Sequence, residues 1–592
     1  MSKHTTGMLE DDFGLLSTAD DDDQQLIIAL DFGTTFSGIS YMFTGSGEAD
    51  PHSIEKWPGE DRNPPKTPTL IRYDPNDKRI FTWGANVDPT CTDKIEGVKL
   101  LLDPSQPAPL FVPQSQSTKK VLASLGKPPL DVASDYIGAL YAHAIKEIES
   151  KFFKDYVAMQ QKKFVLTVPA VWSDKAKDAT LRAAKNAGIF PITLIKEPEA
   201  AALYTLHYLK NKALVIGDAF VLCDAGGGTV DLISYEITAL DPLELKELVP
   251  GTGGVAGSLM LNKRFDEFVM NIVGEEEMFR LRKTKAFTSA MKSFDQEVKP
   301  NFTNDPAKEW FVSFPMAKLP DDAANHLEAD FLLLKCDSVH QIFEPVVNAI
   351  EKLVAEQVDK VRVKRVTAGH PKGKEIKAII LAGGFGASQY LKSRLQKASP
   401  DIQVIQPPDA WSAIVKGAIL SKLPSEASII STVAVRHYGV EAHSAYKESE
   451  DSGQPKFWDK HYGQYRCMKM TWYIEMGEDL QRDKRVEFTF FRSLDPDYTP
   501  AQLIFQDDLL ECNEPEQPAY PDHARGITKT NVTLKADFTQ VPKSEFKEKM
   551  SPDGVAYVSI AYKLVIETKA ANMEFSAEIN GKKLGLVTPT YN

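Results

Sequence analysis

Cysteine is scarce in this 592-residue sequence, which has five, scattered along the chain. No two of them form a Cys-x-x-Cys pair, so the pattern indicates neither a zinc site nor a disulfide framework. Separated thiols in odd number are typical of a reducing compartment. We therefore expect the protein in the cytoplasm or the nucleus.

Long hydrophobic runs and an excess of positive charge are also missing. No apolar stretch approaches the roughly 20 residues of a membrane-spanning helix, and no secretion signal opens the chain. The formal net charge is −13, which argues against general nucleic-acid binding because that needs a basic surface. We expect neither a membrane nor a nucleic acid among the partners.

Two familiar nucleotide-binding patterns are absent as well. Gly-x-x-x-x-Gly-Lys-Ser/Thr does not occur in the sequence, which excludes a P-loop. Gly384-Phe-Gly386 lacks the third glycine of the dinucleotide fingerprint, so a Rossmann site is a poor interpretation. A nucleotide site in this chain would have to be built in another way.

The chain divides into three parts by pattern. Residues 1–25 are polar and acidic, with four consecutive aspartates at residues 20–23, and predict a disordered tail. Strands and helices alternate over residues 26–423, which favours α/β layers. Residues 424–592 show the period-2 alternation of strands, which predicts a separate β-rich domain. A long helix is expected over residues 337–361, broken or kinked at Pro345.

One motif occurs twice. Residues 26–41 and 220–235 each run from an apolar strand through an Asp-x-Gly turn into a second strand that ends in Ile-Ser-Tyr. Glycine and threonine in such a turn expose successive backbone N–H groups, which form a cradle for an anion. An aspartate at the strand end can hold a hydrated Mg²⁺ that phosphate also binds. Two such hairpins predict a clamp on a nucleoside triphosphate.

Further segments make a resemblance specific. Residues 31–37 and 224–231 resemble the two phosphate hairpins of the actin-like ATPases, and Lys196-Glu197-Pro198 opens a segment like their connecting helix. Residues 381–388 resemble the adenosine loop, and residues 408–418 the last helix of the nucleotide domain. Within that superfamily the set is most similar to the heat shock protein 70 (DnaK-like) family.

The resemblance implies an α/β, actin-like (ribonuclease H-like) ATPase domain of two lobes over residues 26–423. It also implies that ATP or ADP binds with Mg²⁺ between the lobes. Mg²⁺ would be held, mostly through its waters, by Asp31, Asp224 and Asp231. Glu197 and Asp231 would orient the attacking water, and Lys99 would contact phosphate, with Lys94 as its competitor.

The same resemblance assigns the remaining site residues. The phosphate oxygens would be bound by Gly33, Thr34, Thr35, Gly226, Gly227, Gly228 and Thr229, the last also a member of the catalytic set. The adenosine would be contacted by Lys299, Gly383, Gly384, Phe385, Ala387 and Asp409. The loop containing Gly257 and Ser258 resembles a further phosphate-side loop.

Each of these residues also has an ordinary structural interpretation. Asp31, Asp224 and Thr229 could be turn residues, since aspartate and threonine favour turns. Glu197 could be an acid stabilised by the helix macrodipole, and Asp409 could be a helix cap. Lys299 could belong to a solvated face.

The chain departs from the family after Leu423. The family's acidic, leucine-rich linker is missing, and the residues beyond it predict strands in place of a helical lid. Both departures resemble the divergent, lid-poor branch of the family.

Three functions remain open at this point. The first is an ATP-binding and ATP-hydrolysing chaperone-like protein whose β-rich domain binds protein clients or co-chaperones. The second is a kinase for a sugar or small acid on the same fold, which would need an extra carboxylate base. The third is a nucleotide-gated scaffold with negligible turnover.

Overall fold

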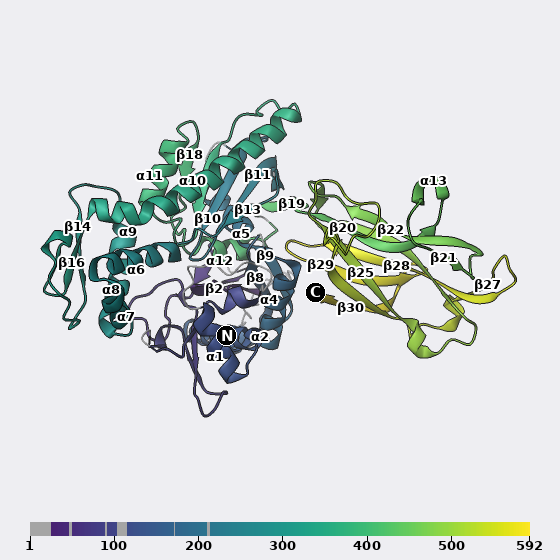
Figure 1. Cartoon of the computed structure of the whole chain (residues 1–592), viewed down its shortest axis with the longest axis horizontal. Coiled ribbons are helices and arrows are strands. Elements are labelled where there is room, and N and C mark those ends of the chain that lie inside the picture. The colour runs from purple at the N-terminus through teal and green to yellow at the C-terminus, as the bar shows by residue number, and fades with distance from the viewer. Residues whose placement is uncertain are drawn as a thin grey trace, which may run out of the picture.

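The computed structural model describes residues 25–45, 50–88, 91–102, 115–170, 172–209, 214–424 and 426–591. The predicted acidic tail, apart from its last residue, lies outside these ranges. An α/β part, purple to green, carries the first two thirds of the chain, and a β-rich part, green to yellow, lies beside it (Figure 1). All five cysteines are free thiols, and none of the described helices is long and apolar enough to cross a membrane.

The first lobe is built on a sheet with the strand order β3-β2-β1-β8-β9. Its strands are β1 (Gln25–Asp31), β2 (Phe36–Phe43), β3 (His52–Ser53), β8 (Gln161–Val168) and β9 (Ile192–Lys196), with β4 (Thr67–Pro68) paired to β2. The pair β1–β2 is antiparallel, as the first hairpin predicts, whereas β8 and β9 run parallel to β1. Long helix α2 (Pro129–Lys151) contributes its apolar face to the core of this lobe.

The second lobe repeats this plan. Strands β10 (Ala219–Ala225) and β11 (Val230–Leu240) form the second antiparallel hairpin, and β17 (Ala378–Ala382) and β18 (Gln403–Ile405) continue the sheet in parallel. In the first lobe α4 (Asp174–Asn186) joins β8 to β9, and in the second α11 (Gln389–Ala398) joins β17 to β18. Each lobe therefore presents one aspartate hairpin at the same place in its sheet.

The lobes meet where helix α5 (Glu197–Leu209), after β9, crosses its counterpart α12 (Ala413–Leu420), after β18. A Cβ atom on Gly417 would lie 1.7 Å from the carbonyl oxygen of Ala200. The helices therefore approach backbone to backbone, and only glycine fits at residue 417. The small side chains of Ala200, Ala201 and Ala202 are buried in the same core.

The second lobe also carries a helical layer. Its helices are α6 (Leu259–Val273), α7 (Glu275–Leu281) and α8 (Lys285–Ser293), followed by a π-helical turn. The long helix α10 (Cys336–Thr367) is one continuous element of 32 residues, so the break expected as one alternative at Pro345 does not occur. Proline cannot bond the carbonyl of Gln341, and the Arg264 guanidinium donates to that carbonyl at 3.1 Å in its place.

The β-rich part is a ten-stranded system in the order β21-β22-β20-β25-β26-β30-β29-β28-β24, with β27 beside β28. Its strands are β20 (His437–Ala445), β21 (Lys456–Asp459), β22 (Gln464–Ile474), β24 (Arg485–Leu494), β25 (Ile504–Cys512), β26 (Lys529–Asp537), β27 (Lys547–Met550), β28 (Ala556–Thr568), β29 (Met573–Ile579) and β30 (Lys582–Tyr591). Alternate residues of β28, such as Ile560, Tyr562 and Leu564, fill the core, as the period-2 alternation of the sequence predicts. The hairpin turn at Asn580 and Gly581 has positive φ at both residues.

The second-lobe sheet does not stop at Leu423. Strand β19 (Ser428–Val433) pairs in parallel with β12 (Leu243–Glu247), and β23 (Asp479–Gln481) pairs with β19. Two of the eight strands of this sheet therefore come from the segment assigned by sequence to the β-rich domain. The label β19 marks this junction in Figure 1.

Candidate functional site

The tips of the two hairpins face each other across the lobe boundary. A Cβ atom on Gly227 would lie 2.3 Å from Thr35 Oγ1, and one on Gly228 would lie 3.6 Å from Thr34 Cγ2. The two turns that the sequence predicts to bind phosphate are thus in contact with one another. Gly227 has to be glycine, because any side chain there would displace Thr35.

The second turn is fixed from behind by the start of α6. The backbone N–H groups of Gly257, Ser258 and Leu259 donate to the carbonyls of Gly228, Gly226 and Gly227 at 3.3, 3.1 and 2.9 Å. The loop at Gly257 therefore braces this turn. Two of the predicted phosphate donors are engaged within their own turns, since Gly226 N–H donates to Thr229 O at 2.9 Å and Gly33 N–H to Ser37 Oγ at 3.2 Å.

Two buried lysine–carboxylate pairs lie at the first hairpin. Lys99 Nζ donates to Glu197 Oε1 at 2.7 Å, so the predicted lysine, not its competitor Lys94, reaches the predicted water-orienting acid. Lys94 lies 3.8 Å from Glu96 instead. Asp31 accepts from Lys66 Nζ at 2.5 Å and from Thr167 Oγ1 at 2.9 Å. Sequence reasoning missed Lys66.

These charges shift the acidity of the carboxyl groups in different directions. Burial alone would raise the pKa of Asp31, but Lys66 and Lys99 outweigh it and the pKa is lowered. Burial raises the pKa of Glu197 despite the attraction of Lys99. The pKa of Asp224 lies well above its usual range, because of burial and the neighbouring charges of Glu197 and Asp231.

The second hairpin has the character of a site for a hydrated cation. Asp224 Oδ1 is buried and accepts no hydrogen bond from the described residues, and Asp231 Oδ2 accepts from Thr229 Oγ1 at 3.1 Å. A buried carboxylate oxygen without a partner is costly, and a nearby cation would relieve it. Within the described ranges, no three His, Cys, Asp or Glu side chains converge to ligate a metal directly. Asp224 and Asp231 therefore fit an ion that keeps most of its waters, as Mg²⁺ does.

The predicted adenosine loop is attached to the end of β10. Gly383 has a φ of +83°, and the amide N–H groups of Phe385 and Gly386 both donate to Ala225 O, at 2.9 and 3.1 Å. The Phe385 ring is 5% exposed and packs in the core of the second lobe. The ring of this predicted adenosine residue is therefore part of the core, and its N–H and C=O are bonded to Ala225 and Ser388.

A cavity of about 270 Å³ lies beside this loop. It brings together Ala387 and Asp409, two predicted adenosine residues, with Pro65 from the first lobe and Trp411 from the second. The Trp411 ring also meets the edge of Phe36, from the first hairpin, at a centroid distance of 5.5 Å. Asp409 does not cap a helix with its side chain, since Oδ2 accepts from Lys416 Nζ at 2.7 Å and from the Tyr204 hydroxyl at 3.1 Å.

Lys299, a predicted adenosine residue, lies against the start of α6. Its ammonium group donates to Asp295 Oδ1 at 2.6 Å, to Asn262 Oδ1 at 2.8 Å and to Ser258 O at 3.4 Å. Lys299 therefore holds the start of α6, which braces the second phosphate turn, whereas other segments line the cavity at Ala387 and Asp409.

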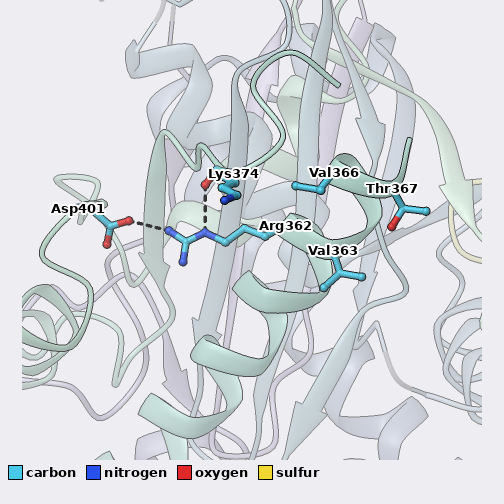
Figure 2. A pocket seen from close by; sticks show the side chains of 6 residues that line it. All are labelled: Arg362, Val363, Val366, Thr367, Lys374 and Asp401. Carbon is cyan, nitrogen blue, oxygen red and sulfur yellow. Dashed lines mark hydrogen bonds and ion pairs between the residues drawn. The ribbon is translucent and has the colours of Figure 1, made fainter. Parts of the chain in front are cut away.

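A larger cavity, of about 520 Å³, lies at the C-terminal half of α10 and contains no predicted site residue. Figure 2 shows Arg362 between Asp401, whose carboxylate it contacts at 2.7 Å, and the carbonyl of Lys374, at 3.0 Å. Val363, Val366 and Thr367 complete the lining on the α10 side. A single carboxylate already paired with arginine supplies no catalytic group here.

The β-rich domain contacts the nucleotide-binding part next to the site. Arg482, directly after β23, donates to the fully buried carboxylate of Glu199, two residues beyond Glu197 on α5. Asp174, the first residue of α4, accepts from the Tyr438 hydroxyl at 3.0 Å and from Asn531 Nδ2 at 3.1 Å. The periodicity of the sequence could not reveal these contacts, since they join residues more than 260 positions apart.

Comparison with known proteins agrees with this geometry. The family model described as "Hsp70 protein" matches residues 111–385. Heat shock 70 kDa protein 12A of Mus musculus is 26% identical over 517 residues, which cover 72% of this chain and 73% of that protein. Human heat shock 70 kDa protein 12B is 24% identical over 486 residues, covering 67% and 68%. The chaperone protein DnaK of Stenotrophomonas maltophilia is 26% identical over 286 residues, covering 47% and 41%.

Two equivalent lobes, each with an aspartate hairpin at their boundary, define an actin-like ATPase fold with a β-rich C-terminal region. The match to the Hsp70 family model and the similarity to the relatives named above support a divergent member of the heat shock protein 70 family. Both the predicted fold class and the predicted family are thereby confirmed, and these matches support a nucleotide-binding function of the Hsp70 kind.

Proposed function

We propose that this chain is an ATP-hydrolysing, chaperone-like protein that binds ATP with Mg²⁺ between its lobes and a protein partner on its β-rich domain. The observation that carries the proposal is the contact of Thr34 and Thr35 with Gly228 and Gly227. It joins the two phosphate turns into one site that neither lobe could form alone. The five free thiols support the cytoplasmic or nuclear location that belongs to this proposal.

ATP hydrolysis requires little from the protein beyond positioning of the reactants and neutralisation of charge. Transfer of a phosphoryl group to water is accelerated mainly by alignment of the reactants and by neutralisation of the phosphate oxygens. Glu197, buried and oriented by Lys99, would hold the attacking water, and turn N–H groups other than those of Gly33 and Gly226 would hold the phosphates. When bound at Asp224 and Asp231, Mg²⁺ would supply further positive charge to the phosphate oxygens.

The link to the β-rich domain starts beside the catalytic acid. Helix α5 begins at Glu197, and Glu199, in the same turn, is bonded to Arg482. A movement of α5 that accompanies lobe closure would therefore move Arg482 and strand β24, which follows it and belongs to the β-rich sheet. This link supports coupling between nucleotide state and partner binding in a chain without the family's acidic linker.

The test is an ATPase assay on the full chain, with Glu197→Gln beside wild type and Glu96→Gln as control. Glu96 is a matched choice because it is also a lysine-paired acid of the first lobe, away from the hairpins. We expect Glu197→Gln to slow hydrolysis about 100-fold or more, with Glu96→Gln close to wild type. Stimulation by unfolded polypeptide supports the chaperone proposal. Turnover that requires a sugar would point to the kinase, and ATP binding without turnover to the scaffold.

A further inference from the structure

Lys66 is a buried lysine that the family resemblance does not assign. It is 5% exposed, lies in the segment Pro64-Pro65-Lys66-Thr67-Pro68, and places Nζ 2.5 Å from Asp31 Oδ2. The other oxygen of Asp31 accepts from Thr167 at 2.9 Å. Lysine is almost never fully buried without a partner, so this position implies a specific role for its charge.

The fold places this lysine over the first hairpin. Strand β4 follows Lys66 and pairs with β2, with Thr67 opposite Ser37. On the other side of β2, Gly38 lies directly opposite Asp31 in the β1–β2 ladder. A Cβ atom on Gly38 would lie 2.8 Å from Lys66 Cγ. The glycine thus leaves room for the lysine to cross the strand and reach the aspartate.

The charges of the site divide unequally between the lobes. The first lobe and α5 supply Asp31 and Glu197, and each is paired with a lysine. The second lobe supplies Asp224 and Asp231, and none of the ion pairs found among the described residues joins Asp224 to a cation. Asp224 Oδ1 is also buried and accepts no hydrogen bond from the described part of the chain. The need for a cation is therefore concentrated in the second lobe.

We propose that Lys66 takes the place of the metal ion on the first-lobe side of the site. Its ammonium group neutralises Asp31 and contacts the polyphosphate of a bound nucleoside triphosphate. An ammonium carries three donors and can bond a carboxylate and a phosphate oxygen together. Mg²⁺ is then required at Asp224 and Asp231 alone, and ATP retains measurable affinity without it. This inference rests on the proposed function.

The experiment is titration calorimetry of ATP with the full chain, once in Mg²⁺ and once in EDTA. The quantity of interest is the dissociation constant of ATP in EDTA divided by the dissociation constant in Mg²⁺. We expect a ratio below about 100 for wild type. Loss of one charged hydrogen bond costs about 10- to 100-fold in affinity. We expect Lys66→Met to lose this much ATP affinity in EDTA and less in Mg²⁺, so that the ratio rises. Lys94→Met, the matched lysine of the same lobe, should leave the ratio unchanged.

A second variant distinguishes loss of the Lys66 contact with ATP from misfolding of the protein. Lys66→Met leaves Asp31 buried and unpaired, whereas Lys66→Met with Asp31→Asn removes both charges and nearly preserves the volume. We expect the double variant to melt close to wild type and still to show the raised ratio. An unchanged ratio in the double variant, or wild-type binding abolished by EDTA, overturns the role of Lys66 and leaves the proposed function standing. Absence of ATP binding even with Mg²⁺ overturns both.

Discussion

The carboxylate of Asp224 occupies the space that a side chain at Gly383 would need, since a Cβ atom at residue 383 would lie 2.3 Å from Asp224 Oδ1. The loop predicted to hold adenosine is therefore packed against the carboxylate predicted to hold Mg²⁺. The two predicted parts of the nucleotide site in the second lobe are therefore held together, because this loop is also bonded to Ala225 at the end of β10.

Gly383→Ala should disturb both stability and nucleotide binding. The new methyl group would meet the Asp224 carboxylate in a backbone conformation with φ of +83°, and we expect a loss of roughly 2–5 kcal/mol in the free energy of unfolding. The affinity for ATP should fall with it, since Asp224 must move. Denaturant unfolding and calorimetry measure the two effects.

Gly369→Ala is the matched control for that substitution. Gly369 has a φ of +69° but no atom within 4 Å of an added Cβ, so it carries the backbone strain of about 1–2 kcal/mol without the clash. Equal ATP affinity in the two alanine variants would show that Gly383 matters only for its backbone conformation.

Glu197→Gln and Glu199→Gln should have different effects on ATP hydrolysis and on the response of the β-rich domain to ATP, although the two residues share one helical turn. Glu197→Gln should slow hydrolysis about 100-fold or more and preserve the response of the β-rich domain to ATP. Glu199→Gln breaks the pair with Arg482, so it should keep hydrolysis within about twofold of wild type and lose that response. Hydrogen exchange of residues 479–494, with and without ATP, reports the response. The interpretation fails if both variants lose hydrolysis equally.

The interdomain contact at Asp174 should depend on pH. Burial would raise the pKa of Asp174, but Lys177, Arg436 and Asn531 favour the carboxylate and lower the pKa below its ordinary value of 3.8. A lowered pKa stabilises the folded state above the unfolded value, and this contribution is lost as the pH falls through the folded value. Asp174→Asn should therefore lower the melting temperature near neutral pH, and the difference from wild type should shrink below about pH 4. A difference that grows on acidification would contradict this sign.

The domain boundary makes a prediction about fragments. A chain ending at residue 423 loses β19 and exposes the edge of β12, whereas one ending at residue 434 retains Ile429 and Val433 in their buried positions. We expect the longer fragment to be soluble and the shorter one to melt about 5 °C lower or more, or to aggregate. Identical melting of the two fragments would show that β19 is dispensable.

Much of the fold follows from local pattern. The two hairpins and the helix at Glu197 were predicted, because periodicity and turn residues are local signals. The sheet membership of β19 was not, since an alternating strand does not specify which distant edge it joins. The continuous helix through Pro345 likewise depends on Arg264, 81 residues earlier.

The residues of the site could be predicted from the sequence where the motif repeats, and could not be predicted elsewhere. Asp31 and Asp224 stand out because two copies of one pattern are unlike chance. Lys66 stands beside a two-residue strand in a proline-rich segment, which has no periodicity to interpret. The direction of the Phe385 ring, into the core, is decided by tertiary packing around a glycine-rich loop.

The central claim is one nucleotide site formed by both lobes, and calorimetric titration of the full chain with ATP and Mg²⁺ tests it most directly. We predict one ATP per chain, with affinity lowered about tenfold or more by Asp224→Asn in the second lobe and by Lys99→Met in the first. Asp218→Asn, which alters the residue just before β10, where Asp218 pairs with Lys372, should bind as wild type. ATP binding that neither Asp224→Asn nor Lys99→Met weakens would contradict the claim.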